Sequence, residues 1–321
     1  MAKPLVIQTE TLDSEARAWL EAQGAEVIVQ SLADLDDALA QRASALVVRT
    51  YTRINPGVLA KLPNVKVIGR AGVALDNIDV GACRARGVEV VHTPGANSDA
   101  VAEYVFAMLF DATRPRLFLE KPIELPRWET LRKDLQADRE LNEMTLGIYG
   151  MGRIGTRVAR IARAFGMRVL YHDIRQIDPA LRSAAEPVSR EALLDGSDIV
   201  TVHVDDRGVN RGLLDADAFG RMKSDVLFIS AARGLIVDPV AAAEFFIAHP
   251  AAQGLFDVHE PEPFGDTYPL LDIANVHLAP HIAAATAKAR RNMSWVVRDV
   301  WRVLLGEEAE HAAPPQEELH T

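Results

Sequence analysis

Short apolar segments alternate with longer amphipathic segments along most of the chain. Runs rich in Val, Ile and Leu carry few charges and are separated by helical patterns such as residues 14–24 and 77–87. Continuous apolar runs of this length are typical of parallel strands that helices cover on both faces. The runs are residues 4–9, 25–30, 45–50, 65–70 and 88–93. This alternation predicts a doubly wound α/β unit.

A long helix and a charged segment interrupt the pattern before it resumes. The helix begins at Ser98 and carries Val101, Val105 and Met108 on one face, whereas residues 114–141 are charged and contain three prolines. We interpret the charged segment as a connection or a partner-facing surface. Further strand-like runs follow at residues 144–150, 167–173, 198–204, 225–230, 252–258 and 275–280. The chain therefore contains two successive α/β units.

Composition narrows the class of protein. The chain has 321 residues, of which 49% are hydrophobic and 25% charged, as in an ordinary soluble protein of one or two domains. A net charge of -10 argues against nucleic acid or anionic membrane as general partners. A single cysteine, Cys83, excludes an intrachain disulfide, and no apolar run reaches the roughly 18 residues of a membrane span. We expect a cytoplasmic protein.

Residues 144–166 contain Gly150, Gly152 and Gly155 in the spacing G-x-G-x-x-G. A strand-like run precedes these glycines, a helix-like run follows, and Asp173 ends the next strand-like run. In dinucleotide-binding folds such glycines allow a tight turn, let the backbone approach a pyrophosphate and let the helix pack closely. The helix N-terminus binds the anion, and the carboxylate accepts the ribose hydroxyls. The sequence predicts NAD as the cofactor, because Asp173 would repel the 2′-phosphate of NADP.

Polar side chains follow three of the later strand-like runs. Arg233 follows one run, Asp257, Glu260 and Glu262 follow another, and His281 follows the last. Because ligands bind beyond the carboxyl ends of the strands in open α/β sheets, we expect these groups at the same edge as the glycine loop. Arginine grips a carboxylate through two parallel hydrogen bonds, and histidine exchanges a proton near neutral pH. No spacing of His, Cys or carboxylates predicts a metal site.

The motifs together resemble the NAD-dependent D-isomer-specific 2-hydroxyacid dehydrogenases, in particular the 3-phosphoglycerate dehydrogenase branch. The resemblance runs through "VVRTYTRIN", "VIGRAGVALDNIDV", "TPGANSDAVAEYVFAML", "LGIYGMGRIG" and "APHIAAAT". It implies reversible hydride transfer between NAD(H) and a D-2-hydroxy acid or 2-oxo acid, with 3-phosphoglycerate as one candidate. Reduction of glyoxylate or hydroxypyruvate is the alternative, and an NAD(H)-sensing corepressor on the same fold is a remote one.

The resemblance also implies roles for individual residues. His281 would protonate the 2-oxo oxygen, or remove the hydroxyl proton in the reverse reaction, and Arg233 would hold the substrate carboxylate. The family's glutamate lies five positions after the strand-end aspartate, which selects Glu262 over Glu260 as the partner of His281. Asp257 matches a family residue near the nicotinamide amide. Other matched cofactor positions are Arg153, Ile154, Ala231, Ala232, Ala283 and Ala284, and matched substrate positions are Arg49, Ala71, Gly72 and Val73.

Several positions depart from the family pattern. Asp205 stands where proline is common, and His259 stands where phenylalanine is usual. Thr130 replaces a basic residue of a "KWxR"-like element, which weakens the expectation of a phosphorylated substrate, although Arg49 and Arg53 offer other positive charges.

The family arrangement predicts two Rossmann-like domains with a cleft between them. Residues 1–97 plus 285–305 would form the substrate domain, and residues 98–284 the NAD-binding domain. We expect one final helix from about Ala283 to Leu305, a disordered tail at 306–321 and no appended regulatory domain. The helix from Ser98 and the charged segment after it are the expected surface of a homodimer.

Overall fold

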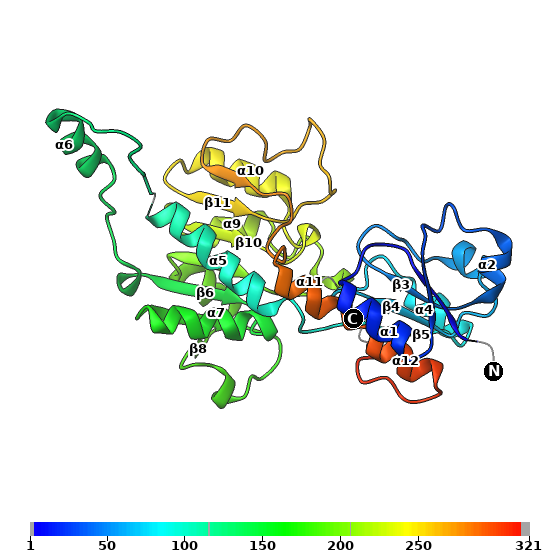
Figure 1. The fold of residues 1–321 in the computed structure, drawn as a ribbon. Coiled ribbons are helices and arrows are strands. Elements are labelled where there is room, and N and C mark those ends of the chain that lie inside the picture. Colours follow the sequence, from blue (N-terminus) through cyan, green and yellow to red (C-terminus); the bar gives the residue numbers. More distant parts are fainter. Residues whose placement is uncertain (1–2, 115, 206, 316–321) are drawn as a thin grey trace. The chain divides into compact units, whose positions relative to one another are not determined.

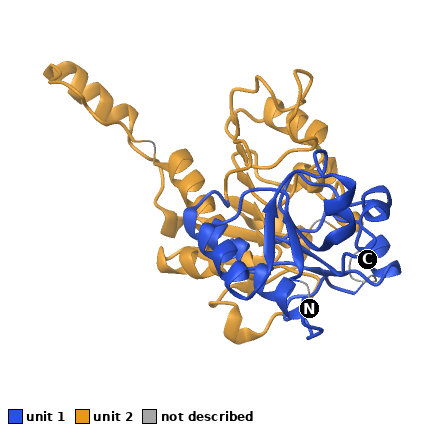
Figure 2. Ribbon diagram, turned by 45° about the vertical axis from the view of Figure 1, so that its right-hand side comes forward, with its two compact units in different colours: residues 1–97, 284–321 blue, residues 98–283 orange. Residues whose placement is uncertain are grey.

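The computed structural model describes residues 3–114, 116–205 and 207–315. The chain forms two compact units (Figure 2). Unit 1 comprises residues 1–97 and 284–321, and unit 2 comprises residues 98–283. Each unit is built on its own parallel sheet, so the α/β architecture expected from the apolar runs is present twice.

Unit 1 contains a five-stranded parallel sheet in the order β2-β1-β3-β4-β5 (Figure 1). Its strands are β1 (Leu5–Gln8), β2 (Glu26–Val29), β3 (Ala43–Val48), β4 (Val67–Arg70) and β5 (Glu89–Val91). Its helices are α1 (Ser14–Ala22), α2 (Asp37–Arg42), α3 (Pro56–Lys61), α4 (Val80–Ala85), α11 (Ala287–Ser294) and α12 (Val297–Leu304). Separate hydrophobic clusters lie on the two faces of the sheet, which is why the strands read as continuous apolar runs.

The end of the chain differs from the expected single helix and disordered tail. The helical segment breaks between Ser294 and Val297, which separates α11 from α12. Residues 306–315 return to the sheet, where Ala312 makes an antiparallel bridge to Val91 and Ala313 is buried in the core. These tertiary contacts order a segment that has no apolar period of its own. The rest of the expected tail, residues 316–321, lies outside the described residues.

Unit 2 contains a seven-stranded parallel sheet in the order β12-β11-β10-β9-β6-β7-β8. Its strands are β6 (Thr145–Tyr149), β7 (Arg168–His172), β8 (Glu186–Pro187), β9 (Ile199–Val202), β10 (Leu227–Ser230), β11 (Gln253–Phe256) and β12 (Val276–Leu278). Its helices are α5 (Ser98–Thr113), α6 (Leu125–Asp134), α7 (Arg153–Ala164), α8 (Arg190–Gly196), α9 (Ala216–Arg221) and α10 (Pro239–Ala248), with short 3₁₀ helices at Leu141–Glu143, Pro179–Leu181, Gly208–Asn210 and Gly234–Ile236. Only β8 has no counterpart among the apolar runs, because it is two residues long and exposed.

The position of β6 creates the binding edge of this sheet. From β6 the chain continues to β7 and β8 on one side and then crosses to β9 on the other side, so the strand order reverses at β6. Ligands of open α/β sheets bind at the carboxyl ends of the strands beside such a switch point. The glycine loop begins immediately after β6.

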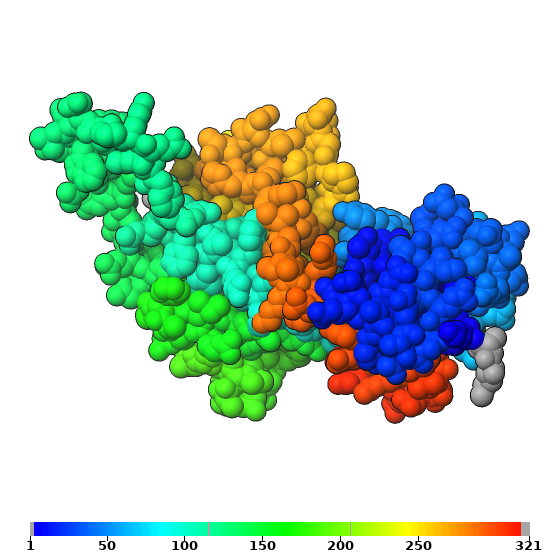
Figure 3. Space-filling view, viewed as in Figure 1, coloured from blue at the N-terminus to red at the C-terminus, as the bar shows by residue number. Residues whose placement is uncertain are grey.

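Residues 116–140 form an arm around α6 that extends away from the sheet of unit 2 (Figures 1 and 3). No residue of α6 is buried. Large exposed apolar side chains of the arm are Leu117, Phe118, Leu119, Leu125, Trp128 and Leu135. Among the described residues, no helix is both long and apolar enough to span a lipid bilayer.

Candidate active site

The glycine loop has the shape that a pyrophosphate requires. Gly150 has φ +98°, and a Cβ there would lie 2.7 Å from the carbonyl carbon of His203. A Cβ at Gly155 would lie 2.2 Å from the Gly150 oxygen, so only glycine lets α7 pack this closely against the loop. Space opens at Gly152, where the nearest atom to a Cβ is 3.8 Å away, and no side chain caps the N-terminus of α7. These features fit a dinucleotide whose phosphates meet the first N–H groups of the helix.

Asp173 follows β7 and lies beside the glycine loop. Its carboxylate accepts hydrogen bonds from the Met151 N–H at 2.8 Å and from the Arg175 N–H at 2.8 Å, and the Arg175 guanidinium lies 3.2 Å away. Burial opposes ionisation of this carboxyl, but these hydrogen bonds outweigh it and hold the pKa below its usual value. Asp173 is therefore an ionised acceptor, and the exposed Arg175 side chain can leave it without disrupting the core.

Replacement of Asp173 by Ala is expected to weaken NAD binding by roughly tenfold, because a buried charged acceptor is lost. NADP binding should weaken less or improve, since the repulsion of the 2′-phosphate disappears. Fluorescence titration of each cofactor measures both constants. Arg168→Ala, at the opposite end of β7, is the control. If the ratio of the NAD and NADP dissociation constants were the same in the Asp173 variant as in the wild type, this role would be contradicted.

Three neighbouring strands deliver the other polar groups. Arg233 follows β10, Asp257 and Glu262 follow β11, and His281 follows β12. These strands are adjacent and parallel, so their carboxyl ends lie side by side. The turn that carries Arg233 also touches the loop that carries Glu262, because a Cβ at Gly234 would lie 2.0 Å from the carbonyl group of His259.

His281 and Glu262 form a hydrogen-bonded pair. Nδ1 of His281 lies 2.7 Å from Oε2 of Glu262. Burial opposes ionisation of Glu262, but the hydrogen bonds from His281 and from the His259 N–H hold its pKa below the usual value. An ionised carboxylate only accepts, so Nδ1 carries the hydrogen and Nε2 is left to exchange a proton with a ligand. The imidazole is partly exposed, as such an exchange requires.

The backbone at His281 adopts a conformation that side-chain-bearing residues rarely occupy. Its φ is +54°. The fully buried carboxylate of Asp257 accepts hydrogen bonds from the N–H groups of Ile282 and Ala283, each at 2.8 Å, and so holds the turn that follows. Burial raises the pKa of Asp257. A place for Asp257 near the nicotinamide amide stays a prediction, and what the structure shows is that both of its oxygens accept from this turn, a contact that no local motif indicates. Strained backbone of this kind persists where surrounding contacts fix it.

The remaining expected residues of unit 2 lie on the same loops. Ala231 and Ala232 are buried between β10 and Arg233, whose Nη1 donates to the Ala232 oxygen at 2.7 Å. Arg153 and Ile154 begin α7 beside the glycines. The structure thus brings the glycine loop, Asp173 and the three catalytic candidates to the carboxyl edge of one sheet.

The expected substrate residues lie in unit 1. Arg49 follows β3, and Ala71, Gly72 and Val73 follow β4, so all four lie at the carboxyl edge of the five-stranded sheet. The carbonyl groups of this loop are engaged: Thr93 donates to the Gly72 oxygen at 3.1 Å, and Nδ1 of His92 lies 2.7 Å from the Val73 oxygen. Ala284, expected beside the cofactor, begins the segment that returns to unit 1.

His203 lies behind the glycine loop and is not an acid–base candidate. Nδ1 of its ring is buried, and Nε2 lies 3.0 Å from Oγ1 of Thr201. Burial lowers the pKa of His203 to about 3, so the ring is neutral at physiological pH.

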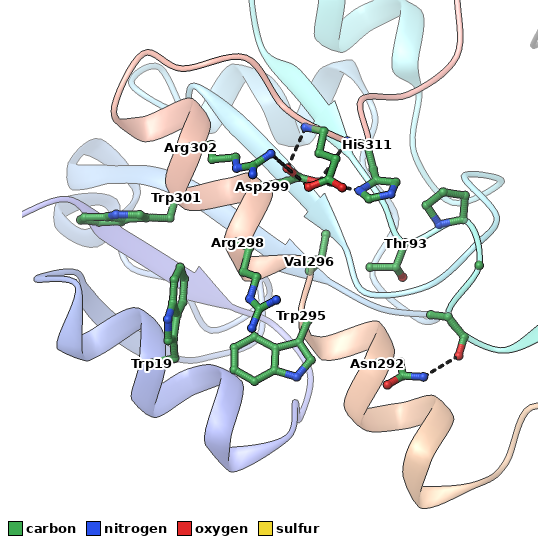
Figure 4. Close-up of a pocket in the computed structure, with 14 residues that line it drawn as sticks. Trp19, Thr93, Asn292, Trp295, Val296, Arg298, Asp299, Trp301, Arg302 and His311 are labelled. Carbon is green, nitrogen blue, oxygen red and sulfur yellow. Dashed lines mark hydrogen bonds and ion pairs between the residues drawn. The ribbon is translucent and has the colours of Figure 1, made fainter.

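A separate pocket of about 590 Å³ lies wholly within unit 1 (Figure 4). Among the described residues, one group brings metal-type ligand atoms within 4.8 Å of one another: Asp299, Glu310 and His311. Asp299 already accepts from the backbone of Glu310 and His311, and Arg302 pairs with Glu310 at 3.2 Å. Both carboxylates are therefore already engaged by groups of the chain, and these contacts tie residues 310–311 to α12.

Known proteins share this architecture and sequence. Residues 106–283 match the family model of the D-isomer specific 2-hydroxyacid dehydrogenase, NAD binding domain. A D-3-phosphoglycerate dehydrogenase of Archaeoglobus fulgidus is 35% identical over 297 residues, which cover 92% of this chain and 56% of that protein. A glyoxylate reductase of Aeropyrum pernix is 35% identical over 267 residues, 81% of this chain and 79% of that protein. The chain spans a little over half the length of the D-3-phosphoglycerate dehydrogenases that it matches.

A solved structure extends the likeness to the whole fold. The D-lactate dehydrogenase of Aquifex aeolicus, determined with NAD and lactic acid, has a TM-score of 0.78 and 27% sequence identity. The match covers 94% of this chain and 96% of that one. The fold, the glycine loop and the family match agree. The chain therefore belongs to the D-isomer specific 2-hydroxyacid dehydrogenases, and its second unit contains their NAD-binding domain.

Proposed function

We propose that this protein is an NAD-dependent dehydrogenase that interconverts a D-2-hydroxy acid and the corresponding 2-oxo acid. The observation that carries the proposal is the His281–Glu262 pair, with Nδ1 and Oε2 2.7 Å apart on the sheet edge that also bears the glycine loop. A polarised imidazole beside a dinucleotide site is the arrangement that proton transfer coupled to hydride transfer needs.

The residues of the site divide the chemistry between them. NAD, held by the glycine loop, the N-terminus of α7 and Asp173, would supply or accept the hydride at C2 of the substrate. Protonated His281 would give its Nε2 proton to the 2-oxo oxygen, and neutral His281 would take the hydroxyl proton in the oxidation. Glu262 stabilises the charged imidazole and fixes its orientation. Arg233 would hold the substrate carboxylate through paired hydrogen bonds and polarise the carbonyl.

Two substrate classes remain candidates. A substrate with a second anionic group, such as 3-phosphoglycerate, is supported by the Archaeoglobus relative and by the exposed Arg53 near Arg49. A small substrate such as glyoxylate or hydroxypyruvate is supported by the Aeropyrum relative. A screen of NADH oxidation with phosphohydroxypyruvate, hydroxypyruvate, glyoxylate and bulky apolar 2-oxo acids separates them. Absence of turnover with every 2-oxo acid would refute the dehydrogenase proposal.

We further propose that the protein is a homodimer and that the arm contributes to its interface. No residue of α6 in the arm is buried, and Phe118 is 81% exposed. Exposed apolar side chains that lie close together often mark a surface that binds a partner. We expect the mass of a dimer in light scattering at micromolar concentration. Phe118→Ser combined with Trp128→Ser should shift the protein toward the monomer. A wild-type monomer would contradict the proposal.

A cytoplasmic location completes the proposal. The buried thiol of Cys83, whose pKa burial raises to about 11, is unreactive and forms no disulfide within the described residues. A protein without disulfides that uses NAD(H) suits a reducing compartment. Fractionation of cells that express the protein tests this location.

A further inference from the structure

We infer that His259 is a positioning residue that couples the chain segments carrying Arg233, Glu262 and His281. This inference rests on the function proposed above. His259 is buried, with only 4% of the residue exposed, so we expect it to act without touching the substrate. Its influence would act through the segments that it joins.

The backbone of His259 contacts two of these segments. Its N–H donates to Oε1 of Glu262 at 2.7 Å, while Oε2 of the same carboxylate receives the bond from His281. Its carbonyl group lies against Gly234, the residue directly after Arg233. A Cβ added at Gly234 would lie only 2.0 Å from this carbonyl group. A shift of His259 would therefore move the carboxylate and press on the arginine turn.

The side chain of His259 reaches the third segment. Nε2 lies 2.8 Å from the carbonyl oxygen of Ala279, two residues before His281. A carbonyl oxygen only accepts, so Nε2 carries the hydrogen of this bond. Ala279 also donates its own N–H to the Phe256 oxygen at 2.8 Å, which continues the pairing of β11 with β12. The imidazole thus sets the position of the backbone from which His281 projects.

An aromatic hydrocarbon at this position would reproduce the packing but not the hydrogen bond. The ring meets Phe264 edge-on, with centroids 4.7 Å apart, and meets Tyr268 at 5.5 Å. Nδ1 lies 3.4 Å from the Tyr268 hydroxyl, a long contact, so the bond to Ala279 is the distinctive polar interaction of the side chain. Phenylalanine would keep these ring contacts without a hydrogen-bond donor.

His259→Phe isolates this bond, and His259→Gln retains an amide N–H that can reach the Ala279 oxygen. We expect kcat with the preferred 2-oxo acid to fall about tenfold in His259→Phe and less than about threefold in His259→Gln, because one buried hydrogen bond is lost or kept. The KM for NADH should not change in either variant. His277→Phe makes the same substitution at an exposed position of β12 and should match the wild type.

A second measurement does not depend on turnover. NMR of protein labelled with ¹⁵N-histidine should show a downfield signal for the hydrogen-bonded Nδ1–H of His281. We expect His259→Phe to shift or broaden this signal, and His259→Gln to preserve it. A kcat of His259→Phe equal to that of the wild type, together with an unchanged signal, would overturn the inference. A parallel loss of NADH affinity and thermal stability in both His259 variants would also overturn it. A wild-type protein inactive on all 2-oxo acids would count against the proposed function alone, because the signal still reports on the positioning.

Discussion

Replacement of His281 by Ala is expected to lower kcat by about three orders of magnitude, which is within the range of about 10²–10⁴ that general acid–base catalysis contributes. The alanine variant loses the Nε2 proton donor and leaves Glu262 without the partner 2.7 Å away. Without this donor, no proton would neutralise the negative charge that develops on the 2-oxo oxygen as the hydride arrives, and the reaction would therefore be slower. Steady-state assays in both directions, with the best 2-oxo acid and its 2-hydroxy acid, measure the effect.

The same variant should bind NADH almost as the wild type does. In the proposed site, the glycine loop and Asp173 would hold the cofactor at the ends of β6 and β7 and the start of α7, and His281 belongs to none of these segments. His277→Ala, an exposed histidine of β12, controls for the loss of an imidazole near the same strand end. An equal fall in kcat and in NADH affinity would indicate a disturbed fold and would remove the assignment of His281 as the proton donor.

Replacement of Arg233 by Ala should lower kcat/KM for the 2-oxo acid by roughly 10²–10³-fold, because the proposed pair of charged hydrogen bonds to the substrate would be lost. Arg233→Lys should recover only part of this loss, since an ammonium group cannot donate two parallel hydrogen bonds in a fixed plane. Added guanidinium ion should partly rescue the alanine variant but not the lysine variant. Initial rates over a range of substrate concentrations, with saturating NADH, measure these effects.

Arg168→Ala provides the matched arginine control. Arg168 begins β7 and pairs with Glu186 on an exposed edge, at 2.8 Å, where such pairs contribute little. Its kcat/KM should equal that of the wild type. A change of less than about threefold in Arg233→Ala would contradict the proposed role, given that bonds to charged groups are worth about 1.5–3 kcal/mol.

Local sequence patterns determined much of this fold. Every strand of three residues or more overlaps an apolar run, because parallel strands covered on both faces are largely apolar. The glycine spacing likewise specified the loop, since Gly150 needs positive φ and Gly155 has no room for a Cβ. The apolar runs and the glycine spacing each involve only a few consecutive residues, so they can be recognised without knowledge of tertiary contacts. The family resemblance added the register that selects Glu262, and the structure places that carboxylate against His281.

Tertiary structure alone decided where residues 306–315 pack and which contacts hold the site residues in place. Residues 306–315 pack on unit 1 through the bridge from Ala312 to Val91 and through burial of Ala313. The segment has no hydrophobic periodicity from which this packing could be predicted. Asp257 binds backbone N–H groups 25 and 26 residues later, and His259 reaches a carbonyl group 20 residues later. Such contacts depend on where parallel strands place their carboxyl ends in space, and neighbours in space leave no pattern along the sequence. The sequence thus indicated the groups that can do the chemistry, and only the packing of β10, β11 and β12 decided the contacts of Asp257 and His259 that hold these groups in place.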